Sequence, residues 1–216
     1  MNNNTFTHAP TGLEVLTAIR DEIPKYITGK RLIHTYAVEK EALRLSEILF
    51  PVLGIDKKYL SDISASALLH DITKQFSKDE QLEICRKYGI PFSEYDAEDS
   101  AVIHSRTGAY IAREKFSVND FVFGAIYSHT TGKADMNIFE KIIFTADYIE
   151  ETRTHSCCVS ARNFFYGNLE GCQNASVLLD KTILMSIDST LSFLIEKGCL
   201  IDIETVNARN CIISHL

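Results

Sequence analysis

The sequence has 216 residues, which is enough for one domain with a full hydrophobic core or for two small domains. Its 22 basic and 29 acidic side chains give a net charge of −7, which disfavours non-specific binding to nucleic acid or to an anionic membrane. With 45% hydrophobic residues and only 4 prolines and 10 glycines, the composition is that of a globular protein rich in helix.

The sequence shows no membrane or export signal. No apolar run approaches the roughly 20 residues that a transmembrane helix needs, and the opening MNNNT lacks the basic and apolar parts of a signal peptide. The six cysteines are scattered without a CxxC pair, so free thiols are expected, including the adjacent Cys157 and Cys158. These features predict a cytoplasmic protein that binds neither nucleic acid nor a membrane.

In the first part of the chain, apolar residues recur every three or four positions, which is the spacing of amphipathic helices. Ser77 and Glu80 form a capping-box pattern that opens a helix ending at Gly89. Helices are also predicted over residues 12–28 with an interruption at Pro24, 31–50 with an end at Pro51, and 58–70.

Further helices are predicted over residues 99–116, 118–128 and 176–197. The segment 141–149 also suits a strand, because it is rich in β-branched and aromatic residues, but its apolar spacing favours a helix. Residues 154–173 give no clear pattern, and the cluster 163–166 fits either the core or a cover over a site.

Four histidines and two aspartates form the most informative set of polar residues. Asp71 directly follows an apolar run, and Asp147 also has apolar neighbours; a charge in such a place needs a partner or a metal. Because adjacent helical residues point about 100° apart, His70 and Asp71 reach one ion only near a helix end or a cavity, where Asp71 is able to bridge two ions. The predicted metal ligands are His34, His70, Asp71, His104, His129 and Asp147.

Each of these histidines taken alone is more often a structural residue than a ligand, but the ordered set has few structural explanations. Imidazole and carboxylate ligands suit Fe, Mn, Zn, Co or Ni and do not choose among them. His8, His155 and His215 lack such surroundings and are predicted to lie at the surface. A helical scaffold with histidines in its core is the alternative, and it predicts no bound metal.

The motifs around these residues resemble the HD superfamily of metal-dependent phosphohydrolases, and within it the YqeK-type branch. The resemblance covers roughly residues 13–210. It rests on RLIH (31–34), LLHDITK (68–74), HSRTGA (104–109), HTTGKADM (129–136), IIFTADYIE (142–150) and ARN (208–210).

The resemblance implies an all-α, single-domain HD-type helical bundle, here residues 12–216 after an N-terminal tail of residues 1–11. It also implies two divalent transition-metal ions, iron before Mn, Co, Ni or Zn, and symmetrical cleavage of diadenosine tetraphosphate into two ADP. The family usually has Pro-Gly-Arg after the position of Glu150, whereas this chain has Glu151, Thr152 and Arg153, so the turn that carries the arginine differs.

Two residues are predicted to be catalytic. A metal pair polarises a phosphoryl oxygen and lowers the pKa of a bound water. Asp71 is expected to orient that water, and Lys74, one helical turn after His70, to hold a phosphate. The further predicted substrate-binding residues are Arg106, Gly108, Thr130, Thr131, Lys133 and Arg153.

These substrate-binding assignments have structural alternatives. Arginine suits phosphate because its guanidinium binds two oxygens at once, and threonine offers a hydroxyl. Gly108 either lets a nucleotide approach closely or serves helix packing, and Lys133 is equally well a solvated surface charge.

Three alternatives for the function remain open. In the first, the protein is an HD enzyme that acts on another nucleotide, such as a nucleoside di- or triphosphate, a 5′-nucleotide or a guanosine alarmone. In the second it is a nucleotide sensor without activity, and in the third it is a scaffold for protein partners. The sequence does not distinguish adenine from guanine, and it does not decide between a monomer and a homodimer.

Overall fold

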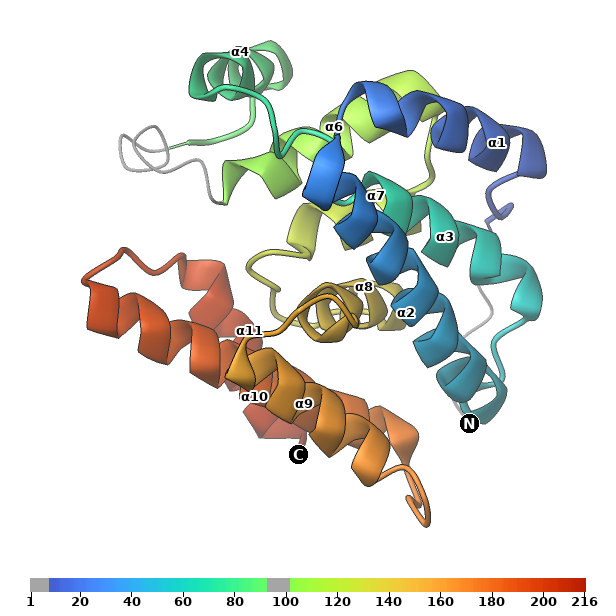
Figure 1. Cartoon of the computed structure of the whole chain (residues 1–216), viewed down its shortest axis with the longest axis vertical. Coiled ribbons are helices and arrows are strands. Elements are labelled where there is room, and N and C mark those ends of the chain that lie inside the picture. Colours follow the sequence, from blue (N-terminus) through green and yellow to red (C-terminus); the bar gives the residue numbers. More distant parts are fainter. Residues whose placement is uncertain (1–7, 93–101) are drawn as a thin grey trace.

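The computed structural model describes residues 8–92 and 102–216, in which all regular structure is helical (Figure 1). The all-α fold is confirmed. Short 3₁₀ turns at Ile23–Lys25 and Lys57–Tyr59 connect some of the helices. The α-helices are α1 (Leu13–Glu22), α2 (Gly29–Leu53), α3 (Leu60–Leu69), α4 (Lys78–Tyr88), α6 (Ile103–Phe116), α7 (Asp120–Ser128), α8 (Ile138–Ile149), α9 (Ser156–Gly167), α10 (Ala175–Lys197) and α11 (Ile203–His215).

Helix α3 is central to the fold, since all its residues from Asp62 to Leu69 are buried. One side of α3 contributes Ile63 and Ala67 to a core shared with α2 and α8–α11. The other side contributes Leu68 and neighbouring residues to a second core shared with α1, α6 and α7. Figure 1 shows α1, α4 and α6 in the upper part of the molecule and α9–α11 in the lower part. Helix α3 therefore lies between the two cores.

Local sequence signals fix several helix ends as predicted. Ser77 and Glu80 form the capping box of α4, and Gly89 ends that helix with a left-handed φ of 65°. The ambiguous segment 141–149 is helical, and α8 starts earlier than predicted because Asn137 and Glu140 form a second capping box. The predicted helix start at residue 99 lies outside the described residues.

The prediction that Pro51 ends the second helix is wrong. Helix α2 continues to Leu53 and stops at Gly54, which has a φ of 68° and donates its backbone N–H to Phe50 and Pro51 carbonyls. Proline removes one hydrogen bond to the preceding turn, but the residues after it are still able to form their own, and two more residues remain helical. The left-handed glycine supplies the actual stop.

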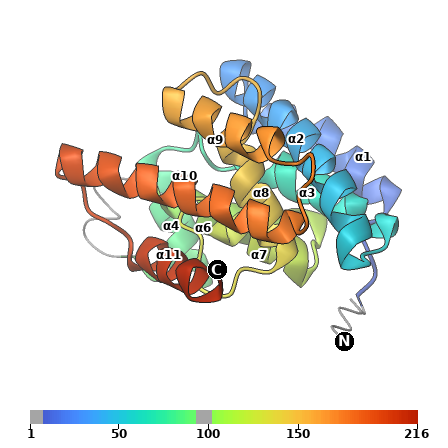
Figure 2. The same ribbon diagram turned by 90° about the horizontal axis from the view of Figure 1, so that it is seen from below.

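The segment 154–173, which had no clear pattern, contains α9. Phe165 is fully buried in the core, and the Tyr166 hydroxyl donates a hydrogen bond to Glu41, so the cluster 163–166 belongs mainly to the core. Figure 2, viewed from the side of α9–α11, shows these helices in front of α8. Arg162 of α9 donates to the backbone carbonyls of Ile149, Glu150 and Arg153, and thereby holds the turn that follows α8.

The prediction that His8 lies at the surface is wrong, whereas His155 and His215 are exposed. His8 is half-buried, with its Nε2 2.8 Å from the carboxylate of the fully buried Asp62. Thr11 donates to the same carboxylate through its backbone N–H at 2.8 Å and its hydroxyl at 2.7 Å. Residues 8–11 of the predicted tail are therefore anchored on α3.

Two further sequence predictions concern cysteines and membrane helices. All six cysteines are free thiols, and Cys85 and Cys158 are buried. None of the helices within residues 8–92 and 102–216 combines the length and the apolar character that a membrane span requires.

Replacing Gly124 with alanine is expected to destabilise the fold. A Cβ at Gly124 would lie 2.6 Å from Glu140 Oε1. That carboxylate cannot move freely, because Lys133 Nζ binds Oε1 at 2.8 Å and the Asn137 backbone N–H donates to Oε2 at 2.9 Å. The clash costs about 1–3 kcal/mol and outweighs the roughly 1 kcal/mol by which alanine favours a helix over glycine. Denaturant unfolding is expected to show a net loss of about 1 kcal/mol.

The matched control for this prediction is Gly167→Ala. Gly167 is also helical, but a Cβ there would meet no atom within 4 Å among the described residues. This variant is expected to be as stable as the wild type or more stable. Equal stabilisation by both substitutions would contradict the close packing of Gly124 against Glu140.

Candidate metal centre

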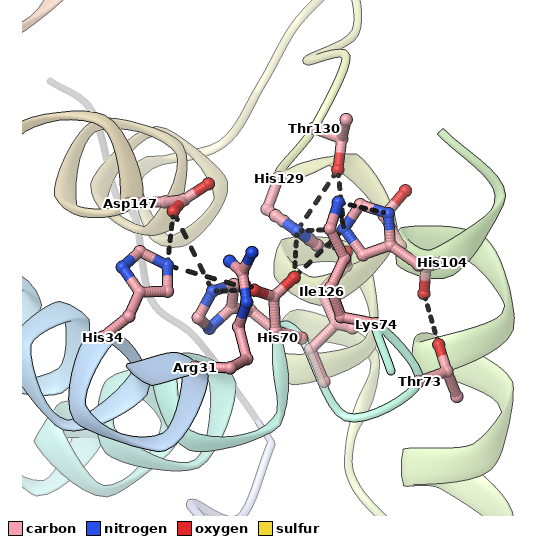
Figure 3. A network of polar contacts seen from close by, with 12 residues as sticks. Arg31, His34, His70, Thr73, Lys74, His104, Ile126, His129, Thr130 and Asp147 are labelled. Carbon is pink, nitrogen blue, oxygen red and sulfur yellow. Dashed lines mark hydrogen bonds and ion pairs between the residues drawn. The ribbon is translucent and has the colours of Figure 1, made fainter. Parts of the chain in front are cut away.

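Most residues of the predicted metal-ligand set lie at or beside helix ends, which converge on one place (Figure 3). His70 is the C-cap of α3, and Asp71 follows it directly. His129 is the C-cap of α7, and His104 is the second residue of α6. At a helix end the chain changes direction, so consecutive side chains such as those of His70 and Asp71 are able to face a common centre. His34 of α2 and Asp147 of α8 complete the set.

The six side chains form overlapping groups whose ligand atoms lie within 4.8 Å of one another. Asp71 belongs to two of these groups, with a different oxygen facing each. Its Oδ2 lies 3.4 Å from His70 Nε2 and 3.9 Å from His34 Nε2, and its Oδ1 lies 3.1 Å from His104 Nε2. The three groups are His34–His70–Asp71, His70–His129–Asp147 and Asp71–His104–His129.

Oxygen acceptors at Nδ1 orient three of the four histidine rings. The Nδ1 atom of His70 lies 2.7 Å from the Ala67 carbonyl, and that of His129 lies 2.7 Å from the Ile126 carbonyl. His34 instead places Nδ1 3.0 Å from a carboxylate oxygen of Glu150. Because each acceptor holds the Nδ1 proton, the Nε2 atoms point to the centre with a lone pair available for a metal.

The arrangement of polar atoms fits metal ions. The Nε2 atoms of His34 and His70 are buried and have no well-aligned hydrogen bond to any described residue, although Asp147 Oδ1 lies 3.0 Å from His34 Nε2. The Nε2 atoms of His104 and His129 face each other at 3.1 Å. Buried polar atoms without partners cost about 1–3 kcal/mol each. Divalent transition-metal ions would satisfy these nitrogens and the carboxylates together.

The histidines at the two ends of the site differ in the direction in which their pKa values are shifted. Burial lowers the pKa of His34, but the nearby carboxylates of Asp147 and Glu150 outweigh it and raise the pKa to about 9. Burial lowers the pKa of His104 to about 4. Burial also raises the pKa of Asp71, yet the neighbouring imidazoles of His70, His104 and His129 hold it well below its usual range. Without a metal, His34 therefore carries a proton that a cation must displace, while His104 is already neutral.

The centre lies in a cleft of about 220 Å³. Three of the predicted substrate-binding residues line it, namely Lys74, Thr130 and Arg153. Lys74 Nζ lies 3.2 Å from His104 Nδ1, and burial lowers the pKa of this lysine. The complete lining is Arg31, Asp71, Lys74, His104, His129, Thr130, Phe144, Asp147, Tyr148, Arg153 and Thr190.

Arg106 and Lys133 do not line this cleft. The Arg106 guanidinium forms an ion pair with Asp202 at the start of α11. Lys133 pairs with Glu140 and lies beside two other surface hollows. Both cations therefore bind carboxylates of the protein, and the geometry gives no support to their assignment to substrate.

Gly108 and Thr131 are buried away from the cleft as well. A Cβ at Gly108 would lie 3.4–3.6 Å from Ile72, Thr73 and the His70 carbonyl, so the glycine brings α6 close to the segment after α3. This contact fits the packing alternative, and the assignment of Gly108 to a nucleotide stays a prediction. The Thr131 hydroxyl donates to the Gly132 carbonyl rather than pointing into the cleft.

The structure adds two residues that the sequence analysis did not assign to the site. Arg31 Nη1 donates to Asp71 Oδ2 at 2.7 Å, and Glu150 is completely buried against His34. The helical spacing held a signal for both, since Arg31 lies three residues before His34 and Glu150 three residues after Asp147. That signal gives proximity but does not show which side chains meet.

An all-helical domain in which histidines and aspartates from different helices converge on one buried cleft has the arrangement that a metal-dependent hydrolase needs. Comparison with known families agrees with this class. The model of the HD domain matches residues 31–152, from the second helix to the turn after α8. The match spans more than half of the chain, and the chain therefore belongs to the HD domain family.

Known proteins resemble the chain over most of its length. The symmetrical bis(5'-nucleosyl)-tetraphosphatase of Bacillus subtilis is 29% identical over 89% of this chain and 94% of its own. The protein of the same name from Staphylococcus aureus is 32% identical over 84% and 86%. A crystal structure from Clostridium acetobutylicum, of an HD superfamily hydrolase described as involved in NAD metabolism, has a TM-score of 0.79 at 30% identity and covers 93% of this chain and 97% of its own.

Proposed function

We propose that the protein is a metal-dependent phosphohydrolase that cleaves diadenosine tetraphosphate symmetrically into two molecules of ADP. The observation that carries the proposal is the buried Asp71, whose two oxygens face two separate groups of histidines. This geometry suits a pair of metal ions bridged by one carboxylate. Relatives named for the symmetrical reaction match the chain over most of both lengths.

The proposed ligands are His34, His70, Asp71, His104, His129 and Asp147. We further propose iron as the native metal, because the resemblance to the YqeK-type branch implies it. Mn, Co, Ni and Zn are the alternatives, because imidazole and carboxylate suit all of these ions. Bound metal ions would supply Lewis-acid polarisation of a phosphoryl oxygen and a water of lowered pKa. Residues 12–216 form the proposed catalytic domain of a cytoplasmic enzyme.

The positive charges of the cleft suit a polyphosphate substrate. The protein as a whole has a charge of −7, but Arg31, Lys74 and Arg153 line the cleft together. Arg31 and Arg153 are each paired with one aspartate of the centre, at 2.7 Å and 2.6 Å. Metal ions would compete for these carboxylates, and the cations would then be available to bind phosphate oxygens. The Thr130 hydroxyl is a further donor beside them.

A second candidate is an HD hydrolase acting on another nucleotide. The Clostridium structure, which is described as involved in NAD metabolism, favours it. The cations that line the cleft suit the phosphates of either kind of substrate.

The proposal is tested by metal analysis of protein purified without oxygen, followed by turnover of diadenosine tetraphosphate with products separated by chromatography. About two metal ions per chain and ADP as the sole product are the expected result. Metal with turnover of a different nucleotide supports the second candidate. Metal and nucleotide binding without any turnover would indicate a sensor, and absence of metal would overturn the metal centre itself.

A further inference from the structure

The His34 ring is held differently from the other two oriented rings. His70 and His129 use backbone carbonyls, which no side-chain substitution removes. His34 uses the side chain of Glu150, which is 0% exposed. Among the ring-orienting acceptors within the described residues, Glu150 is therefore the one that sequence variation is able to tune.

Thr152 in turn holds Glu150 in place. The Thr152 hydroxyl donates to Glu150 Oε1 at 2.7 Å, which is the same oxygen that faces His34 Nδ1. The Thr152 backbone N–H donates to Oε2 at 2.5 Å. Both carboxylate oxygens thus accept hydrogen bonds, and the only role left to His34 Nδ1 is that of donor.

From this chain of hydrogen bonds we propose that Glu150 is a positioning residue, held by Thr152, that fixes His34 as a metal ligand. With its Nδ1 proton bound to Glu150, His34 presents Nε2 to the centre. The inference rests on the proposed metal centre and adds an outer layer to it. It also gives a role to the turn after α8, whose backbone is held separately by Arg162.

Glu150→Gln tests the proposal with little change in shape. One orientation of the amide places its NH₂ group against the Thr152 N–H, and the other places it against His34 Nδ1. Two donors face each other in the first case. In the second, His34 must accept at Nδ1 and turn a proton towards the metal. Either outcome weakens ligation, and loss of such an outer-shell partner typically costs about 10- to 100-fold in metal affinity.

The measurement is the affinity of the full-length protein for Zn²⁺, by competition with a chromophoric chelator, together with the visible spectrum of the Co²⁺-loaded protein. Glu150→Gln is expected to weaken the binding of one of the two ions about 10- to 100-fold and to change the visible spectrum of the Co²⁺-loaded protein. Thr152→Val keeps the backbone donor and removes only the hydroxyl, so a loss of about 2- to 10-fold is expected. Thr152→Ser retains the hydroxyl and is expected to match the wild type.

Glu140→Gln is the matched control, because Glu140 is also buried and lies at the opposite end of α8. It is expected to lower stability without changing metal affinity. Equal Zn²⁺ affinity in Glu150→Gln and the wild type would overturn the inference and leave the metal centre standing. An equal loss in Glu140→Gln would also overturn it, by showing a general effect on the fold. A wild type that binds no metal would overturn the proposed centre and this inference together.

Discussion

Asp71→Asn is expected to lower kcat/KM for diadenosine tetraphosphate by at least about 10³-fold and to reduce bound metal below two ions per chain. Asparagine has nearly the shape of aspartate, but it lacks the charge and presents an NH₂ group on one side. Because the two oxygens of Asp71 face different groups of histidines, one substitution weakens both halves of the centre. Metal content and product formation, measured on the same preparation, check this result.

The matched control is Asp62→Asn, which changes a second buried aspartate, on α3, the helix that precedes Asp71. Asp62 is 0% exposed and accepts hydrogen bonds from residues 8–11 rather than facing the centre. This variant is expected to lose about 1–3 kcal/mol of unfolding free energy while it keeps both metal and activity. If Asp71→Asn retained two metal ions and full activity, the bridging role of Asp71 would be wrong.

Lys74→Met is expected to lower kcat/KM by about 10²–10³-fold and to leave the metal content unchanged. Methionine keeps an unbranched stem of similar length but removes the charge that lies 3.2 Å from His104 and lines the cleft. The loss is expected because a donor aimed at the phosphoryl group stabilises the charge that develops in the transition state. Steady-state kinetics and metal analysis together separate this effect from loss of the ions.

Lys133→Met provides the comparison for Lys74. Both lysines were predicted from the sequence to bind substrate, but Lys133 pairs with Glu140 outside the cleft. Its substitution is expected to change kcat/KM by less than about twofold, since surface charges away from a site contribute little. A large loss of kcat/KM in Lys133→Met, with none in Lys74→Met, would show that the substrate phosphate binds outside the cleft.

The sequence predicted best those features that local chemistry fixes. Ser77 and Glu80 define a helix start by themselves, because their hydrogen bonds span only three residues. The six proposed ligands stood out because histidine and aspartate in apolar surroundings need partners. Pro51 shows the limit of such rules, since a proline disturbs the turn before it and leaves the following residues able to stay helical.

The sequence by itself determined the all-helical class, most helix positions and the set of residues that meet at the centre. Only the tertiary structure decided which other charged residues join them. Arg106 lies two residues from His104, yet it pairs with Asp202 at the start of α11. Arg31 contacts Asp71 at the site, and Glu150 reaches the site although it lies 116 residues from its partner His34. Spacing along the chain fixes the face of a helix, but the packing of α2, α3 and α8 sets which faces meet. Those long-range contacts depend on the whole core and have no local signal.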